Sequence, residues 1–383
     1  MEMLEPFKEN KRLCPNCLEE FYPGDCEIYA TVPRLELLKE KPGNVLARMH
    51  ARRYPEPLTG PYYTERMAHR RCPFCNYFLP SNIERVRNLY IAIVGDTAAG
   101  KSHFIAAMID QIKQGKLQSA DTFVRFRCLT PEVEEYYEDN YFKPLFGLKQ
   151  SLPPTQLNED IPPLIYELDI KASHGRPARA VNIILYDTGG GNYVLQQRAM
   201  IYSRHMLHAD AMIFLADSMK MPEIFSRLPL QIQKNISVSP RSVTSSLDSV
   251  IDALERFRGL SAGSRRLSIP IAITLSKSDL LKYLRAASKQ YCFMRNPSYG
   301  GGIDLDDVEA VDEDVRDLLS DFGEHAFLQA TNAFSCAKFF ASSATGHAPN
   351  DQGIFSAIHP IRCLDPLLWA LYELQVIRPG SYT

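Results

Sequence analysis

A glycine-rich segment between an apolar run and an amphipathic stretch limits what this chain can fold into more than any other feature. Residues 89–94 are apolar and of strand length, and residues 95–102 read Gly-Asp-Thr-Ala-Ala-Gly-Lys-Ser, which fits the pattern G-x-x-x-x-G-K-[ST]. Apolar residues then recur at helical spacing from Phe104 onward. A strand, a phosphate-binding loop and a helix in this order predict a nucleotide-binding α/β protein.

The chemistry of this loop explains its residue types. Glycines let successive backbone N–H groups turn toward a phosphate chain, and the N-terminus of the following helix adds the positive end of its dipole. Lys101 is expected to reach the β- and γ-phosphates, and the Ser102 hydroxyl is expected to bind Mg²⁺. The predicted nucleotide contacts of the loop are Gly95, Asp96, Thr97, Ala98, Ala99, Gly100, Lys101 and Ser102.

Composition indicates an ordinary globular protein. The chain has 383 residues, of which 45% are hydrophobic and 23% charged, and its formal net charge is −2. The near-neutral charge gives no global argument for binding nucleic acid or an anionic membrane. No apolar run approaches the about 18 residues of a membrane span, and the acidic N-terminus lacks the apolar core of a signal peptide. We therefore expect a cytoplasmic protein without membrane contact, in which the cysteines are mostly reduced.

Four of the nine cysteines form two matched pairs, Cys14-Pro-Asn-Cys17 and Cys72-Pro-Phe-Cys75. Two C-x-x-C pairs in a reducing compartment are typical of a tetrahedral zinc site, because each pair closes a tight turn that presents two sulfurs to one ion. Residues 18–71 separate the pairs and must form an insertion if the two turns are adjacent. Four unrelated buried thiols and a redox dithiol remain alternatives.

Two regions of different character follow each other along the chain. Residues 1–85 hold both cysteine pairs and predict a zinc-ribbon-like module with an insertion. Residues 86–383 alternate apolar strands with amphipathic helices, which predicts an α/β domain with a mostly parallel sheet flanked by helices. Strands are expected at 89–94, 164–170, 180–186, 210–216, 269–275 and 338–342. Helices are expected at 101–113, 194–207, 243–258, 310–333 and 364–377, with 121–160 and 284–309 as additions to this plan.

A second motif follows the predicted strand 180–186, which ends in Asp187-Thr-Gly-Gly190. A carboxylate at the end of a strand beside the phosphate loop can hold Mg²⁺, usually through water. The N–H of Gly190 is placed to contact a γ-phosphate, as the pattern D-x-x-G does in GTPases. A solvent-exposed turn is the other reading of the motif.

Two later motifs bear on the base. Ser276-Lys277-Ser-Asp279 follows the predicted strand 269–275, with serine where Asn or Thr is usual in N/T-K-x-D. In that motif the carboxylate accepts hydrogen bonds from guanine N1–H and the exocyclic amine, whereas adenine presents an acceptor at N1. The lysine stem packs on the base plane. Predicted strand 338–342 runs into Ser343-Ala344-Thr, which matches an S-A-x turn whose backbone N–H contacts guanine O6.

The order of these four motifs makes residues 88–380 resemble the Ras-like branch of P-loop GTPases. The C-P-x-C pairs, the Asp-Thr-Gly-Gly and Ser-Lys-Ser-Asp forms and the terminal segment 364–369 also resemble the double-GTPase-type proteins of bacterial conflict systems. The resemblance implies GTP or GDP, Mg²⁺ and Zn²⁺ as ligands, and catalytic contributions from Lys101, Thr155 and Gly190. It also implies a Mg²⁺ ligand from a threonine just before the second strand, with Thr155 as the candidate and Thr130 as the alternative. It further implies a protein effector or GTPase-activating partner in a multi-protein antiviral defence or regulatory system.

One departure from the family pattern concerns catalysis. Gly191 stands where a Ras-like enzyme carries the glutamine that positions the attacking water, so hydrolysis is expected to be slow or to need a partner. One hypothesis is therefore a guanine-nucleotide switch with slow or partner-stimulated hydrolysis. The other is a non-hydrolysing GTP-binding scaffold whose zinc module docks a protein or nucleic acid, although net charge does not support nucleic acid. A P-loop kinase or ATPase ranks third, because Asp279 favours guanine and no arginine-rich lid is evident.

Overall fold

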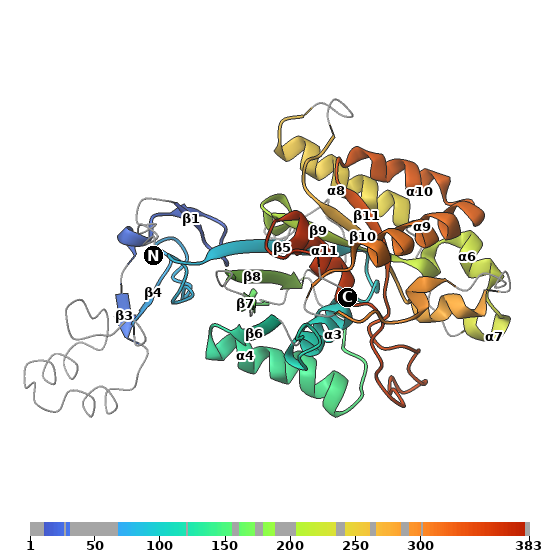
Figure 1. Ribbon diagram of the computed structural model, residues 1–383, viewed down its shortest axis with the longest axis horizontal. Coiled ribbons are helices and arrows are strands. Elements are labelled where there is room, and N and C mark those ends of the chain that lie inside the picture. The colour runs from blue at the N-terminus through green and yellow to red at the C-terminus, as the bar shows by residue number, and fades with distance from the viewer. Residues whose placement is uncertain are drawn as a thin grey trace, which may run out of the picture.

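The computed structural model describes eleven parts of the chain, and the statements below concern these parts. They are residues 11–26, 28–30, 68–119, 122–154, 161–172, 179–187, 204–234, 242–260, 266–284, 291–299 and 302–379. A twisted sheet with helices around it makes up most of the molecule, and the segment near the N-terminus lies at one end (Figure 1).

The central sheet has seven strands in the order β11-β10-β9-β5-β8-β7-β6. The bounds are β5 (Arg87–Gly95), β6 (Thr122–Cys128), β7 (Leu164–Ala172), β8 (Arg179–Asp187), β9 (Ala211–Asp217), β10 (Ile271–Ser276) and β11 (Ala337–Ala341). The five strands from β11 to β8 are parallel, and β7 and β6 continue the sheet antiparallel. Every residue of β9 and β10 is buried, as expected for strands covered on both faces. The predicted α/β class with a mostly parallel sheet is confirmed.

Helices flank this sheet and connect its strands. The longer ones are α3 (Lys101–Lys113), α4 (Pro131–Tyr137), the π-helix η2 (Glu138–Gly147), α8 (Val243–Phe257), α9 (Leu305–Asp321) and α11 (Asp365–Glu373). The shorter ones are α6 (Pro222–Arg227), α7 (Leu230–Gln233), α10 (His325–Ala330), η3 (Ser218–Lys220), η4 (Ser278–Tyr283), η5 (Cys292–Met294) and η6 (Thr331–Ala333). Helix α3 contacts β5 and β8, α11 contacts β9 and β10, and α9 contacts β11.

The edge strand β6 was not predicted, because residues 121–160 were expected to be a loop with a helix. Its side chains alternate, with Val124 buried and Arg125 and Arg127 placed opposite two acids of β7. Arg125 lies 2.9 Å from Asp169, and Arg127 lies 2.6 Å from Glu167. Cross-strand ion pairs of this kind stabilise an antiparallel edge, and this pairing is invisible until β7 is placed beside it.

The helix predicted at 310–333 is two helices in the structure. Helix α9 ends at Asp321, and α10 starts at His325. Gly323 between them has a φ of 74°, a left-handed conformation that commonly terminates helices. The helix predicted at 194–207 lies mostly outside the described residues, which are helical at 204–207.

A small N-terminal segment carries the two cysteine pairs. It contains β1 (Arg12–Leu13), β2 (Glu20–Phe21), η1 (Pro23–Asp25), β3 (Ile28–Ala30) and β4 (Ala68–Arg70). β1 pairs with β2 and β3 pairs with β4, each antiparallel. A compact cluster of Phe21, Cys26, Leu79 and Ile83 with the paired cysteines forms its core. A segment of this size has little apolar surface to bury, and such units usually depend on a metal or disulfides.

Candidate functional site

The carboxyl ends of the parallel strands bring the sequence motifs together at one edge of the sheet. The phosphate loop follows β5, Asp187 ends β8, Ser276 ends β10 and Ser343 lies just after β11. In open α/β sheets ligands bind in the crevice outside the carboxyl ends of the strands. The topology therefore predicts that these motifs share one site. The cavity at this edge is lined by residues of three of them.

A cavity of about 650 Å³ lies at this edge, a size usual for a small-molecule site. Its lining includes the predicted residues Thr97, Ala98, Ala99, Gly100, Lys101, Ser102, Lys277, Asp279, Ser343 and Ala344. Gly95 and Asp96 were predicted contacts but do not line the cavity. One cavity is thus lined by three motifs that are far apart in the sequence: the phosphate loop, Ser-Lys-Ser-Asp and Ser-Ala-Thr.

The phosphate loop is wound around the side chain of Lys101. Its Nζ donates to the carbonyl oxygens of Gly95, at 3.0 Å, and Asp96, at 3.1 Å. Burial lowers the pKa of Lys101 to about 8, against the opposing influence of the carboxylates of Asp187 and Asp96. Gly100, with a φ of 89°, is the N-cap of α3. A buried cation and a helix N-terminus at one cavity wall suit an anionic ligand.

Asp187 is buried close to this loop. It lies opposite Ile93 of β5 in the parallel register, and its Oδ2 accepts a hydrogen bond from the hydroxyl of Tyr141 at 2.9 Å. Tyr141 comes from the π-helix η2 and was not predicted as a site residue. A hydroxyl bound to a carboxylate fixes the direction of its oxygens, which is how outer partners orient a metal ligand.

Two predicted residues, Thr155 and Gly190, lie outside the described residues, as does Gly191. The segment leading to Thr155 does reach the cavity, since Leu152 and Pro154 line it. Nε2 of His103 accepts a hydrogen bond from the backbone N–H of Leu152 at 3.1 Å. Thr130, the alternative to Thr155, is buried as the N-cap of α4 and does not line the cavity.

The far end of the cavity holds the residues expected to read a base. Asp279 is buried and lines the cavity, and Lys277 before it has a left-handed backbone with a φ of 59°. The backbone N–H of Ser278 donates to the carbonyl oxygen of Ser342 at 3.1 Å, which ties the two loops together. Ser343 Oγ accepts a hydrogen bond from the N–H of Gly346 at 2.9 Å and shapes the second loop.

A segment that the sequence did not single out closes one side of the cavity. The N–H of Phe355 donates to the carbonyl of Lys149, and the N–H of Ser151 donates to the carbonyl of Gly353, both at 2.7 Å. The ring of Phe355 is buried at the cavity wall, 6.3 Å from the ring of His103. The only sequence signal was the length of chain between Ser343 and the last helix.

A second lysine supports the phosphate loop and was also missed. Lys220 Nζ lies 2.7 Å from Asp96 Oδ2 and 2.8 Å from the carbonyl oxygen of Thr97. Only 2% of its side chain is exposed. Its position three residues after β9 was the available signal, because chain that follows a parallel strand is delivered to the same edge as the other motifs.

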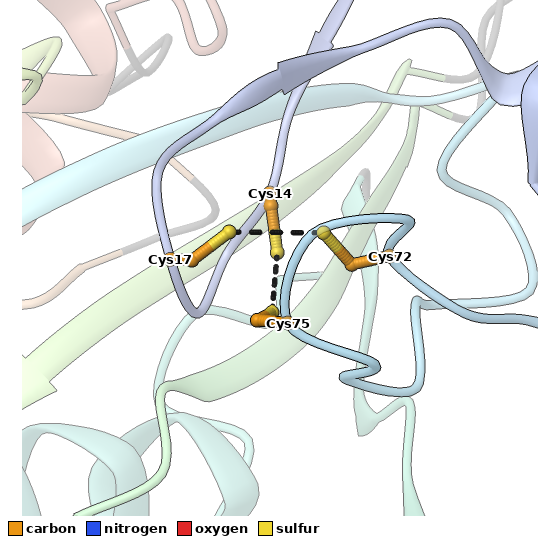
Figure 2. Close-up of side chains that lie close together, drawn as sticks. All are labelled: Cys14, Cys17, Cys72 and Cys75. Carbon is orange, nitrogen blue, oxygen red and sulfur yellow. Dashed lines mark hydrogen bonds between the residues drawn. The ribbon is translucent and has the colours of Figure 1, made fainter.

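The two cysteine pairs form a candidate metal centre away from that cavity (Figure 2). All four sulfurs lie within 4.8 Å of one another. The Cys14–Cys75 and Cys17–Cys72 sulfur separations are both 3.7 Å. Tetrahedral zinc with Zn–S bonds of about 2.3 Å places its sulfurs about 3.8 Å apart. The four residues Cys14, Cys17, Cys72 and Cys75 therefore fit a structural zinc ion.

The two cysteine pairs lie on two turns of the same conformation. Backbone N–H groups of Asn16 and Phe74 donate to the sulfurs of Cys14 and Cys72, each at 3.4 Å. The residue after each second cysteine has a left-handed backbone, with a φ of 59° at Leu18 and 58° at Asn76. N–H groups aimed at sulfur favour thiolates over thiols. This repeated geometry supports a metal centre over four unrelated thiols.

The first cysteine turn packs directly on the sheet. The hydroxyl of Tyr90 on β5 donates to the carbonyl of Leu13 at 2.5 Å, and that of Tyr186 on β8 donates to the carbonyl of Pro15 at 2.6 Å. Leu18 is buried with both tyrosines in a cluster of its own. Just past the turn, Glu19 lies 2.7 Å from Arg204.

The strand order, the loop wound around Lys101 and the Ser-Lys-Ser-Asp turn in one cavity define a P-loop GTPase of the Ras-like type. A model of the Double-GTPase 2 family matches residues 89–360. The chain belongs to that family. The match spans the sheet from β5 to the segment beside Phe355, and so includes all three motifs that line the cavity.

A relative and two solved structures are similar to this chain. The "Putative ESX-1 scaffolding and assembly protein SaeC" of Mycolicibacterium smegmatis is 28% identical over 329 residues, which cover 80% of each chain. The Arl6 BBS3 small GTPase of Trypanosoma brucei with bound GppNp is 14% identical and has a TM-score of 0.29, over 76% of this chain and 99% of that one. The signal recognition particle receptor SRb-GTP/SRX complex of Chaetomium thermophilum is 14% identical and has a TM-score of 0.30, over 70% and 94%.

No helix in the described ranges is both long and apolar enough to cross a bilayer.

Proposed function

We propose that this protein is a guanine-nucleotide-dependent switch with slow or partner-stimulated GTP hydrolysis. The observation that carries the proposal is that Asp279 and Lys277 line the same cavity as the phosphate loop. A buried carboxylate at the base end selects guanine, because guanine offers two N–H donors there and adenine offers an acceptor. The buried ammonium of Lys101 and the N-terminus of α3 suit the phosphates at the other end.

The roles of the remaining residues follow from this orientation. Ser102 and Asp187, with Thr155, are the proposed Mg²⁺ ligands, and Lys101 and Gly190 are the proposed γ-phosphate contacts. Ser343 and Ala344 are proposed to complete the base site through their backbone. A Mg²⁺ ion held by these residues would neutralise phosphate charge. The hydroxyl of Tyr141 holds the Asp187 carboxylate in one orientation, so that the ligand is ordered before the ion binds.

The chain is proposed to divide into a zinc-binding module, residues 1–85, and a GTPase domain, residues 86–383. Tyr90 and Tyr186 of the sheet hold the backbone on both sides of Cys14. These contacts favour a structural brace over a freely moving docking module. Tyr186 immediately precedes Asp187 in β8, so the hydrogen bond to Pro15 anchors the strand that carries this proposed Mg²⁺ ligand.

The protein is further proposed to act within a multi-protein system, through a protein effector or GTPase-activating partner. The name of the Mycolicibacterium smegmatis relative, a scaffolding and assembly protein, supports an assembly role. A role in bacterial conflict or defence rests on the resemblance carried by the cysteine pairs and the motif forms. Gly191, at the position of the water-positioning glutamine, supports hydrolysis that depends on such a partner.

Replacement of Asp279 tests the base assignment. Asp279→Asn is expected to exchange preference for GTP for preference for xanthosine triphosphate, because xanthine presents a carbonyl where guanine presents its amine. Binding of both nucleotides by calorimetry measures the change, and Asp252→Asn on the exposed face of α8 is the matched control. If Asp279→Asn retains full preference for GTP, the base-reading role of Asp279 is wrong.

The alternative is a non-hydrolysing scaffold that holds guanine nucleotide permanently. Gly191 favours it from the sequence, and so does the name of the relative. Single-turnover phosphate release, measured with and without proteins that co-purify, separates the two functions. Release that is slow alone and faster with a partner supports the switch, and no release under either condition supports the scaffold. The nucleotide that co-purifies gives independent information, since retained GTP indicates slow turnover.

A further inference from the structure

Residues 96–99 of the phosphate loop form a β-turn whose central peptide has a defined orientation. The N–H of Ala99 donates to the carbonyl of Asp96 at 3.2 Å, which closes the turn. Ala98 has a φ of 63°, whereas Thr97 before it keeps a negative φ. A positive φ at the third residue is the mark of a type II turn, where glycine is usual. Alanine alone favours the type I turn, in which the central peptide is rotated by about 180°.

Lys220 holds this peptide in the type II orientation. Its ammonium binds the carbonyl of Thr97, the oxygen of the central peptide, at 2.8 Å. It also forms an ion pair with Oδ2 of Asp96. The other carboxylate oxygen, Oδ1, accepts a hydrogen bond from the N–H of Thr97 at 2.8 Å. Ala98 lines the cavity whereas Lys220 and Asp96 do not. The Lys220–Asp96 ion pair therefore contacts the loop on the side facing away from the cavity.

The consequence for the ligand follows from the planar peptide. In a trans peptide the C=O and the N–H point in opposite directions, so a Thr97 carbonyl bound to Lys220 turns the N–H of Ala98 the other way, toward the cavity. In a type I turn the carbonyl of Thr97 would face the cavity instead. A carbonyl oxygen there would repel phosphate, whereas an N–H binds it.

We infer that Lys220 is a positioning residue that keeps the phosphate loop in its anion-binding conformation, by holding the Thr97–Ala98 peptide with its N–H toward the phosphates. This inference rests on the proposed nucleotide site and assigns the residue that shapes it. Lys220 acts through the loop and contacts no phosphate. The loop therefore tolerates alanine at position 98, where a turn of this type usually needs glycine.

The test is the affinity for GDP and GTPγS of four variants, measured by calorimetry. Lys220→Met is expected to weaken both nucleotides by about 10- to 100-fold, because a charged hydrogen bond that orders the loop is lost. Adding Ala98→Gly to Lys220→Met is expected to restore at least half of that loss on a logarithmic scale, since glycine adopts the turn unaided. Ala98→Gly alone is expected to stay within about 3-fold of the wild type. Lys143→Met, at an exposed lysine paired with Asp139, is the control.

A competing account is that Lys220 only neutralises the charge of Asp96. In that case Asp96→Asn would rescue Lys220→Met and Ala98→Gly would not, and the inference is overturned. Affinity of Lys220→Met within about 2-fold of the wild type would overturn it as well.

Thermal unfolding without nucleotide shows that each variant folds. If Lys220→Met does not fold, Lys220→Gln, which keeps a side-chain donor, is compared with Lys220→Leu. If the wild type binds neither nucleotide, the proposed function itself fails; if it binds both and Lys220→Met does too, the inference alone fails.

Discussion

The ammonium of Lys277 lies 2.7 Å from Oδ2 of Asp217, a carboxylate on the neighbouring strand. The parallel register of β9 and β10 places Asp217 opposite Ser276, one residue before the lysine. Asp217 is buried, whereas about a third of the Lys277 side chain is exposed and faces the cavity. The head of the lysine is therefore held in place, so its aliphatic stem has a fixed path along the cavity wall.

We expect Asp217→Asn to weaken guanine-nucleotide binding by about 3- to 10-fold, because Lys277 loses a charged partner and gains side-chain freedom. Asparagine can still accept the N–H of Met219, which Asp217 does at 3.1 Å, so the local helix is preserved. GDP titration measures the effect, with Asp304→Asn at the N-cap of α9 as control. Unchanged affinity would mean that Lys277 does not need this anchor.

Two glycines of the phosphate loop should respond differently to alanine. A Cβ at Gly95 would lie 2.5 Å from the carbonyl oxygen of Leu215, whereas a Cβ at Gly100 meets nothing within 4 Å. Gly95→Ala is expected to lower the free energy of unfolding by about 2–3 kcal/mol, because the backbone of β9 must move. Gly100→Ala is expected to cost about 1 kcal/mol through its positive φ alone. Urea unfolding of both variants checks the order, and equal losses would contradict it.

We expect the purified protein to contain about one zinc ion per chain. Cys72→Ser should abolish that zinc and lower the thermal midpoint, because the small N-terminal core is held together by the ion. Cys26→Ser is the control, since Cys26 is buried nearby but lies outside the four-sulfur cluster. Zinc is measured by mass spectrometry. Protein free of zinc whose thiols pair into disulfides would support the redox alternative instead.

The pH dependence of stability should carry a contribution from His205. Burial lowers the pKa of His205 to about 3 from its ordinary value of 6.5, so the folded protein binds fewer protons than the unfolded chain between these values. The free energy of unfolding should therefore fall as pH drops below 6.5, by about 2 kcal/mol at pH 5 from this group. His205→Phe keeps the stacking on Tyr186, whose ring lies 3.7 Å away, and should lose less stability between pH 7 and 5. Equal losses in the two proteins, measured by urea unfolding, would contradict this assignment.

The sequence predicts those strands whose own residues form a recognisable pattern, without reference to their neighbours in the sheet. Apolar runs such as 89–94 are legible because a strand covered on both faces needs no knowledge of its neighbours. The sequence did not predict β6, because its two arginines are stabilised only by ion pairs with the acids of β7, which the sequence does not place beside them. The prediction of one helix at 310–333 is wrong, since the sequence alone does not distinguish a helix-ending glycine from one tolerated inside a helix.

The site shows the same division. Lys101, Asp279 and the four cysteines belong to spaced motifs whose chemistry is local. Lys220 and Tyr141 belong to no motif, and their importance depends on which backbone or carboxylate they meet after folding. Gly95 and Asp96 are part of the phosphate-loop motif and yet lie behind the cavity, because a loop that wraps a ligand also has an outer side.

The first cysteine turn contacts Tyr186, and Glu19 just past the turn contacts Arg204. Tyr186 directly precedes Asp187, a proposed Mg²⁺ ligand, so the candidate metal centre and the proposed nucleotide site contact neighbouring residues of β8. Linkage makes any energetic coupling between two such sites reciprocal: the factor by which zinc changes nucleotide affinity equals the factor by which nucleotide changes zinc affinity. Zinc supply in the cell would then set the working affinity for nucleotide, and nucleotide occupancy would set how readily the protein gives up its metal.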